Sequence, residues 1–342
     1  MDVSGSLAER GADNESDAPQ ERAARTRLVV GAVTVLTFAL LAATLLSLTA
    51  SRWWLGDLAV HFPLQYVALA LIAFLVFVGL RRPVLAALAL GIAFVNALSA
   101  APVLATRPPP EPRLVTQTVE PPLRLRMVAI NVLYRNREHT QVAEFLRRER
   151  PEVVALMEMN DRWRRALATV AKDYPHRYET KGSTGRGVSL WSRVPLGDAG
   201  VLSVEAQREP AIQATLMVAN RPVRLFVVHT SWPMSPASAA LRNRQLALLA
   251  GEARATQVMP LVVIGDLNIS PFSPHFQRLL KDGGLRSAAE GFGWQPTWPT
   301  YMPPAGIQID HALITRTLRV RAFRRGPFTG SDHRPIVLDL AL

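Results

Sequence analysis

Leu261-Val-Val-Ile-Gly-Asp-Leu-Asn268 combines four apolar residues with an acid and an amide that follow them closely. Four consecutive apolar residues predict a buried strand, and Asp266 and Asn268 follow at its end. Ser331-Asp-His333 makes a second such group, directly before the apolar run Pro335–Leu340. Hydrolysis of a phosphate ester needs a carboxylate that activates water, a carboxylate that holds a metal, and a cationic or donor group. The two stretches together supply all three.

The charge of the chain is unevenly distributed. Residues 1–120 contain 9 basic and 9 acidic side chains, whereas residues 121–342 contain 30 and 18, so the formal excess of +12 lies in the second part. A basic domain suits a partner that carries phosphate. The alternative is that the excess reflects genomic composition, since 36 of the 39 basic residues are Arg. The lack of cysteine excludes disulfides, zinc sites built on thiolates, and cysteine nucleophiles.

Three uncharged stretches of 23 residues precede the basic part of the chain: Leu28–Ala50, Leu58–Leu80 and Pro83–Ala105. As a helix, each would be about 34 Å long, enough to cross a hydrocarbon core of about 30 Å. A signal peptide has a single short apolar core, so it does not explain three in series. The stretches predict a multi-pass protein of the cell (inner or plasma) membrane, with three transmembrane helices over residues 28–105.

Charged residues in the short loops predict the orientation of these spans. Arg22, Arg25 and Arg27 precede the first span, and Arg81-Arg82 separate the second from the third. Because basic loops tend to stay in the cytoplasm, residues 1–27 are expected to be a cytoplasmic tail. The polar composition of that tail predicts disorder. Three crossings would then place the rest of the chain on the extracytoplasmic side.

Two features flank or interrupt the apolar stretches. Residues 106–122 contain six prolines and predict a semi-rigid linker. His61, Gln65 and Asn96 lie in or near the spans and could mark a transport path. Scattered polar residues more often form hydrogen bonds between helices, and we favour that interpretation.

Residues 123–342 show a different pattern, in which short apolar runs alternate with fewer amphipathic segments. Leu125–Asn131 predicts a strand, and Thr140–Arg150 has the spacing of a helix. About ten predicted strands with few intervening helices favour two packed sheets flanked by helices. This α/β sandwich is the predicted second domain.

Polar residues of a restricted kind follow one predicted strand after another. Taken singly, each has a structural explanation, such as a helix cap, a turn or a satisfied buried histidine. Taken together, they are the acids, amides and imidazoles that phosphate chemistry uses. The eight residues are Asn131, Glu158, His229, Asp266, Asn268, Asp310, Asp332 and His333.

This ordered pattern resembles the endonuclease/exonuclease/phosphatase superfamily, which includes deoxyribonucleases, apurinic endonucleases, sphingomyelinases and inositol polyphosphate phosphatases. The resemblance implies a four-layer α/β/β/α sandwich like that of deoxyribonucleases. The spans ahead of the domain also look like those of a membrane-anchored bacterial subgroup called YafD-like. The matching segments occur in family order over almost all of residues 123–342: Met127-Val-Ala-Ile-Asn131, Val154-Ala-Leu-Met-Glu158, Gly187–Leu196, Val227-Val-His229, Gly265-Asp-Leu-Asn268, Ile309-Asp-His311 and Ser331-Asp-His333.

The resemblance also implies roles for the matching residues. Asp266 would take the proton from the attacking water, and Asn268 would orient that water or the phosphate. His333, polarised by Asp310, would face the scissile phosphate, and His229 would donate to another phosphate oxygen or to the leaving group.

A metal site is implied at the same place. Glu158 would be the main ligand of a divalent ion, supported by Asn131 and Asp332. Carboxylate and amide oxygens without thiolate favour Mg²⁺ or Mn²⁺. Some nucleases of the family carry an acid two residues after the first-strand amide, where this chain has Leu133, so a second metal contact from that side is not expected.

The sequence therefore predicts a metal-dependent phosphodiesterase tethered to a bilayer. Basic charge favours nucleic acid as the substrate, whereas the tether favours a phospholipid headgroup or another phosphate ester. The alternative from another class is a non-catalytic binding or scaffold domain that keeps the fold. The complete set of eight polar residues disfavours it, because a site without function would be expected to lose some of them.

Overall fold

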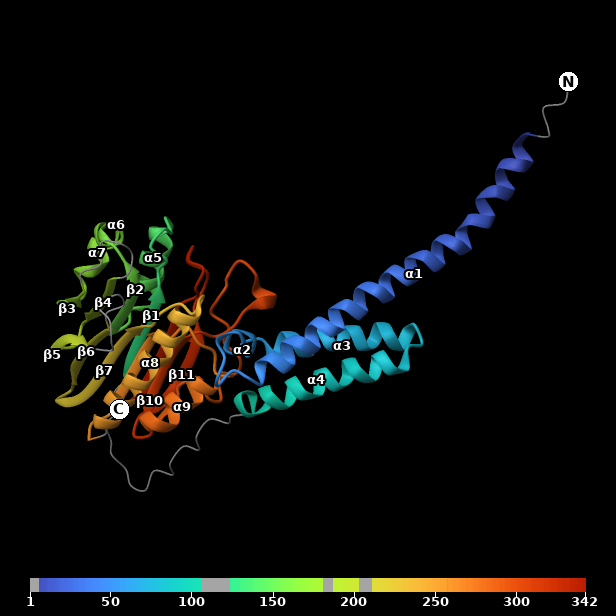
Figure 1. The fold of residues 1–342 in the computed structure, drawn as a ribbon. Helices are drawn as coiled ribbons and strands as arrows, with labels where there is room; N and C mark the ends of the chain where they lie inside the picture. Colours follow the sequence, from blue (N-terminus) through green and yellow to red (C-terminus); the bar gives the residue numbers. More distant parts are fainter. Residues whose placement is uncertain (1–5, 106–123, 181–186, 203–210, 257) are drawn as a thin grey trace, which may run out of the picture.

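The computed structural model describes residues 6–105, 124–180, 187–202, 211–256 and 258–342, with side chains from Glu21 onward. The linker predicted over residues 106–122 lies outside the described residues. The rest divides into a region of apolar helices and a domain of two sheets, which lie side by side in Figure 1.

Two sheets of six strands each form the second domain. The first sheet has the order β11 (Arg319–Arg325), β12 (Ile336–Ala341), β1 (Arg124–Asn131), β2 (Val153–Met159), β4 (Gly187–Ser192) and β3 (His176–Glu179). The second has the order β5 (Leu196–Leu202), β6 (Ala211–Val218), β7 (Arg221–His229), β8 (Leu261–Asp266), β10 (Asp310–Thr315) and β9 (Leu285–Ser287).

The main hydrophobic core lies between the sheets. In β1, Leu125, Met127 and Ala129 face this core, whereas Val128 and Ile130 face the helices outside. Both faces of the strand are covered, which explains why its sequence is continuously apolar rather than alternating.

Helices cover the outer face of each sheet. The helices α5 (His139–Glu149), α6 (Asp161–Ala166) and α7 (Ala168–Ala171) pack on the first sheet. On the second sheet lie α8 (Pro236–Ala255) and α9 (Pro274–Gly283). The result is the two-sheet α/β sandwich that the sequence predicts, with a layer of helices on either side (Figure 1).

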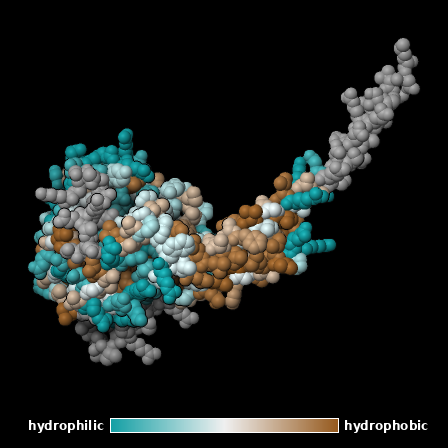
Figure 2. Space-filling model, in the orientation of Figure 1, coloured by the Kyte–Doolittle hydropathy of each residue, from teal (hydrophilic) through white to brown (hydrophobic). Residues whose placement is uncertain are grey.

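The helical region consists of α1 (Ser6–Ser47), α2 (Trp54–Ala59), α3 (Pro63–Gly79) and α4 (Pro83–Leu104). Two segments are long and apolar enough to cross a membrane, Glu21–Ser47 and Pro83–Leu104. Figure 2 shows hydrophobic surface gathered over these helices and a mixed surface over the sandwich.

Two predictions about the course of the helices in this region are wrong. The expected continuous span over Leu58–Leu80 is broken, because the chain forms the short helix α2, leaves helical geometry at Phe62, and resumes with Pro63 as the first residue of the 17-residue helix α3. The residue before a proline is disfavoured in helical conformation. Residues 6–27, expected to be disordered, are helical as part of α1. Ala, Glu and Arg are frequent there and favour helix.

The polar residues of the helical region divide into two kinds. The side chain of Asn96 donates to Thr44 Oγ1 at 2.8 Å, so this residue bonds between helices as predicted. For His61 and Gln65 that prediction is wrong, since both contact the sandwich: His61 pairs with Ser270, and Gln65 donates to the carbonyl of Gly306 at 3.0 Å.

Gly265 is required where β8 passes close to β7. Its φ is +143°, and an added Cβ would lie 2.0 Å from the carbonyl oxygen of Val228. Side chains are rarely accommodated at such φ values, and a backbone carbonyl of a central strand cannot move aside. We expect Gly265→Ala to lower the melting temperature of the full-length protein strongly, or to prevent folding.

The matched control is Gly251→Ala in α8. An added Cβ there meets nothing within 4 Å, and alanine favours helix, so this variant should melt at or above the wild-type temperature. Equal melting temperatures for the two variants would contradict the close approach at Gly265.

Candidate active site

Strand ends from both sheets bring the predicted residues to one edge of the sandwich. The strands β7 and β8 run parallel and β10 runs antiparallel to β8, with His229 opposite Asp266 and Asp266 opposite Asp310. In the first sheet, β1 ends at Asn131 and the parallel strand β2 carries Glu158 near its own end. Parallel neighbours and their antiparallel partner thus present these side chains at the same edge.

Asn131 links the two sheets at this edge. Its side-chain Nδ2 donates to Glu158 Oε1 at 3.0 Å and to Asp266 Oδ2 at 3.1 Å. Its Oδ1 accepts from the backbone N–H of Leu133 at 3.1 Å, which fixes the orientation of the amide. One amide therefore sets the distance between the carboxylate of the first sheet and the carboxylate of the second.

Asp266 lies at the centre of the group and is 1% exposed. Its Oδ2 is 3.7 Å from Nε2 of His229 and 3.7 Å from Nε2 of His333. Its Oδ1 accepts from the backbone N–H of Asn268 at 2.9 Å. A buried carboxylate held by an amide and flanked by two imidazoles is suited to exchange a proton with a small molecule such as water.

His333 and Asp310 form a buried pair. Nδ1 of His333 is 2.9 Å from Oδ2 of Asp310, and both residues are 5% exposed or less. Burial disfavours the charged imidazole, but the carboxylates of Asp310 and Asp266 outweigh it and raise the pKa of His333 to about 10. The ring is therefore an imidazolium at neutral pH, and its Nε2–H lies on the side of Asp266.

The side chain of Asn268 is anchored rather than free. Its Nδ2 donates to the carbonyl of Thr230 at 2.9 Å, and the residue has a positive φ of 47°. Asparagine tolerates this conformation better than most residues. The structure thus places Asn268 beside Asp266, with its backbone N–H already committed to that carboxylate.

Glu158 and Asp332, the acids predicted to hold a metal, differ in how completely their oxygens are bonded. Oε1 of Glu158 accepts from Asn131 and Oε2 accepts from the backbone N–H of Tyr134, at 3.0 Å each. Asp332 accepts from Trp298 through Oδ2, while its Oδ1 is buried with no hydrogen-bond partner among the described residues. A buried carboxylate oxygen of Asp332 without a partner among the described residues fits a ligand of a hard divalent cation.

A second group of potential ligands fits an ion less well. Ligand atoms of Asp266, Asp310 and His333 lie within 4.8 Å of one another. An imidazolium has no lone pair to offer a metal, and Nδ1 of His333 is already bonded to Asp310. The chemistry of the donors therefore favours the end of the site at Glu158 and Asp332.

Three residues support the site through contacts that the sequence did not reveal. Ser331 Oγ donates to the carbonyl of Asn131 at 2.7 Å and accepts from the N–H of His333 at 3.1 Å. Thr297 Oγ1 accepts from the N–H of Asp310 at 3.2 Å. The indole of Trp298 donates to Asp332 at 3.3 Å. The position of Ser331 directly before Asp332 was the one signal that could have identified it.

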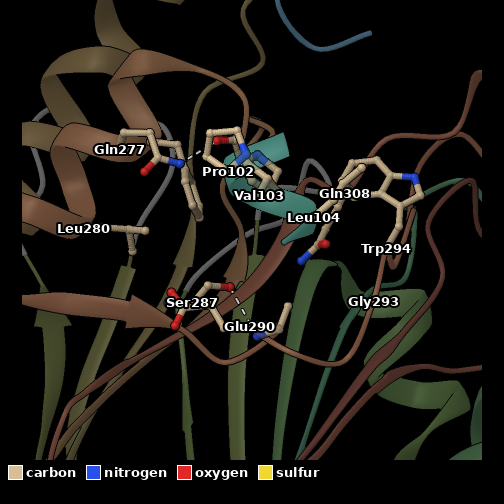
Figure 3. A pocket seen from close by; sticks show the side chains of 13 residues that line it. Pro102, Val103, Leu104, Gln277, Leu280, Ser287, Glu290, Gly293, Trp294 and Gln308 are labelled. Atoms are coloured by element: carbon tan, nitrogen blue, oxygen red, sulfur yellow. Dashed lines mark hydrogen bonds between the residues drawn. The ribbon is translucent and has the colours of Figure 1, made fainter. Parts of the chain in front are cut away.

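A cavity of about 120 Å³ lies elsewhere, between the end of α4 and the region of α9 (Figure 3). Its lining includes Pro102, Leu104, Gln277 and Trp294. None of the eight strand-end residues contributes to it. The site is therefore located by converging side chains and not by this cavity.

The charge of His333 gives a prediction that does not depend on turnover. Its folded pKa exceeds the ordinary value of 6.5, so the stabilisation from its carboxylate partners is fully present below pH 6.5 and is lost as the pH rises through about 10. In metal-free full-length protein at pH 8, nitrogen NMR should find the ring of His333 protonated. Asp310→Asn should lower this pKa markedly.

His311 is the internal control, since burial lowers its pKa to about 4 and its ring should be neutral at pH 8. Titration of His333 near pH 6.5 in the wild-type protein would refute the pairing with Asp310 and Asp266.

Comparison with known proteins identifies the family. A family model described as Endonuclease/Exonuclease/phosphatase family matches residues 128–333, which is more than half of the chain. No curated protein matches the sequence.

Solved structures with the same fold have low sequence identity. Humanized D. rerio TDP2 is 15% identical with a TM-score of 0.55, and the match covers 64% of this chain and 99% of that chain. An endonuclease/exonuclease/phosphatase from Beutenbergia cavernae DSM 12333 is 22% identical with a TM-score of 0.53, over 64% and 72%. The 3' phosphatase NExo from Neisseria, bound to a product DNA hairpin, is 21% identical with a TM-score of 0.54, over 63% and 98%. These likenesses concern the fold. The matched family model spans all eight strand-end residues, and it shows that the chain belongs to the endonuclease/exonuclease/phosphatase family.

Proposed function

We propose that this protein is a membrane-anchored, divalent-metal-dependent phosphodiesterase. The observation that carries the proposal is the environment of Asp266, which is buried between Asn131 and two imidazoles at the edge where both sheets end. Members of the family are hydrolases of phosphate esters. The geometry supports a base at Asp266 and a positive charge at His333.

In the proposed reaction, Asp266 takes a proton from a water molecule as its oxygen attacks phosphorus. The imidazolium of His333, kept charged by Asp310, stabilises the negative charge that develops on the phosphoryl oxygens. The bond from phosphorus to the ester oxygen breaks, and His229 supplies a proton to the leaving oxygen. Asn268 holds Asp266 in place through its N–H.

Glu158, Asp332 and Asn131 would hold Mg²⁺ or Mn²⁺. When bound, the ion would neutralise phosphate charge. Asn131 contacts both Glu158 and Asp266, so it also holds the metal-binding end of the site in register with the water-activating end.

Nucleic acid is the proposed substrate. The domain carries the whole positive excess of the chain, and two proteins of similar fold, D. rerio TDP2 and Neisseria NExo, have been solved with DNA products. A phospholipid headgroup is the second candidate, favoured by the apolar helices that dock beside the site. A non-catalytic scaffold is disfavoured because the described site retains all eight residues in contact with partners of matching chemistry.

The anchoring is part of the proposal. Two helices have the length and composition to cross a bilayer, and α3 adds a shorter apolar helix between them. We place the amino terminus in the cytoplasm, the sandwich on the extracytoplasmic side, and the chain in the YafD-like subgroup. Such an arrangement puts the basic domain beside the membrane surface.

Hydrolysis by the full-length protein in detergent tests the proposed reaction. Bis-p-nitrophenyl phosphate, single-stranded DNA and phospholipid vesicles should be compared as substrates in Mg²⁺, Mn²⁺ and EDTA. We expect the protein to cleave DNA in the presence of Mg²⁺ or Mn²⁺ and not in EDTA. Asp266→Asn and His333→Gln should each lower kcat by about 10²–10⁴-fold, the range expected for loss of a proton-transferring or charge-stabilising group.

His176→Gln is the matched control, because His176 pairs with Ser192 at the opposite end of the strands. It should leave kcat unchanged. Activity that survives both Asp266→Asn and His333→Gln would contradict the catalytic roles proposed for these residues. Hydrolysis of the vesicles but not of DNA would identify phospholipid as the substrate class.

The orientation is tested by a reporter enzyme fused after Leu342. Alkaline phosphatase, which is active only outside the cytoplasm, should be active in this position, and a cytoplasmic reporter such as β-galactosidase should be inactive. The reverse pattern would place the domain in the cytoplasm.

A further inference from the structure

The apolar helices contact the sandwich through buried polar side chains at the active-site edge. Asp57 in α2 and His61 after it are 1% and 4% exposed. Oδ1 of Asp57 accepts from Oγ of Ser273 at 2.8 Å, and Nδ1 of His61 is 2.8 Å from Oγ of Ser270. Both serines follow β8 in the chain. The helical region therefore docks on the loop that leaves the catalytic strand.

The short helix α2 is held firmly against α1. An added Cβ on Gly56 would lie 2.6 Å from the carbonyl oxygen of Leu46 and 2.9 Å from the backbone nitrogen of Ala50. Such contact leaves α2 little freedom to shift. The position of the next residue, Asp57, is thus set by the apolar helices themselves.

Arg242 connects Asp57 to the catalytic loop. This residue of α8 is 0% exposed, and its Nη2 donates to Oδ2 of Asp57 in a buried ion pair. Its Nη1 donates to the carbonyl oxygen of Asn268 at 2.8 Å. A buried guanidinium requires a counter-charge, since an unpaired buried charge is strongly destabilising. Asp57 supplies that charge from outside the family domain, whose matched region begins at residue 128.

Asn268 links Arg242 to Asp266 through its own backbone carbonyl and N–H. Its φ of +47° lies in the left-handed region, which asparagine tolerates better than most residues. Arg242 holds the carbonyl of Asn268, and the N–H of Asn268 donates to Asp266 Oδ1 at 2.9 Å. A continuous chain of bonds thus leads from the helical region to the carboxylate at the centre of the site.

We propose that Asp57 and Arg242 are positioning residues, so that the apolar helical region completes the catalytic loop. The proposal rests on the proposed function. Neither residue touches the reacting atoms, and their effect is to keep the peptide of Asn268 in the geometry that orients Asp266. Hydrolysis then depends on correct docking of the helices, and loss of the pair affects kcat more than KM.

The first test is Asp57→Asn in the full-length protein in detergent, with bis-p-nitrophenyl phosphate as substrate. The amide keeps the size of the side chain and removes the negative charge that holds Arg242. Since small misplacements of reacting groups cost up to about 10²-fold in rate, we expect kcat to fall by about 10–100-fold with KM within about threefold. Amide hydrogen exchange should become faster over residues 267–270.

The second test separates positioning from stability. In the double variant Asp57→Leu, Arg242→Met, an apolar pair replaces the buried ion pair, a change that commonly leaves stability unaltered or raised. The double variant should melt at about the wild-type temperature. Its kcat should stay low because the side chain at position 242 can no longer donate to the carbonyl of Asn268. Recovery of kcat to within about twofold of the wild-type value would reduce the pair to a structural role and overturn the proposal.

Asn96→Leu is the matched control. Asn96 is 2% exposed and bonds to Thr44 within the helices, without reaching the sandwich. It should leave kcat and the exchange of residues 267–270 unchanged. A loss of kcat equal to that of Asp57→Asn would show that any disturbance of the helices has this effect, which contradicts a specific link through Arg242.

The exchange measurement distinguishes the two proposals. If the wild-type protein hydrolyses nothing, the proposed function fails, but faster exchange in Asp57→Asn still supports the link from the helices to the loop. If the double variant does not fold, the test rests on kcat and on the hydrogen exchange of residues 267–270, compared between Asp57→Asn and Asn96→Leu. Unchanged exchange over residues 267–270 in Asp57→Asn refutes the link whatever the activity.

Discussion

Burial of the Asp266 carboxylate determines how the two sheets must pack against each other. A charged group with 1% exposure is tolerated only with hydrogen bonds and opposite charge around it. Those partners come from strands of both sheets and from two loops: the amide of Asn131, the N–H of Asn268, and the imidazoles of His229 and His333. Every one of them is supplied by the end of a strand or by the residues next to it. The sandwich must therefore pack in one relative register for the carboxylate to be satisfied at all, and that register is also the one that assembles the site.

The site has two ends with different chemistry. At one end, Asp310 keeps His333 charged and so excludes it from binding a cation. At the other, Glu158 and Asp332 present carboxylate oxygens, one of them without a partner among the described residues. Asn131 joins the ends. An ion held by Glu158 and Asp332 would therefore use ligands other than the carboxylates that keep His333 charged. The helical region contributes from a third direction, since its Asp57 neutralises the arginine that fixes the loop of Asp266. Removing the helices would take away the carboxylate that neutralises that arginine, so the sandwich and the helices are energetically coupled at this edge.

Much of the fold and most of the site were predictable from local patterns. Apolar runs such as Leu261–Ile264 and Ile336–Leu340 gave clear strands because both faces of these strands are covered. The polar residues at their ends were recognisable because side chains at strand ends of a sandwich converge on one edge. The break at Phe62 and Pro63 was missed because the residues on both sides of it are apolar, and only the proline marks the change.

The role of Arg242 could not be predicted for a different reason. Its partner Asp57 lies 185 positions away in the chain, and neither residue sits in a motif or at a strand end. Buried pairs of this kind leave no periodic signal, so only the three-dimensional structure reveals them.

The position of a bound ion distinguishes a metal site at Glu158 and Asp332 from one at Asp310 and His333. Crystals of the full-length protein grown with Mn²⁺ would locate the ion by its anomalous scattering. We expect one peak in contact with the carboxylates of Glu158 and Asp332, with the pair of His333 and Asp310 intact beside it. A peak held instead by Asp310 and His333, or no peak at saturating Mn²⁺, would contradict the metal site at Glu158 and Asp332.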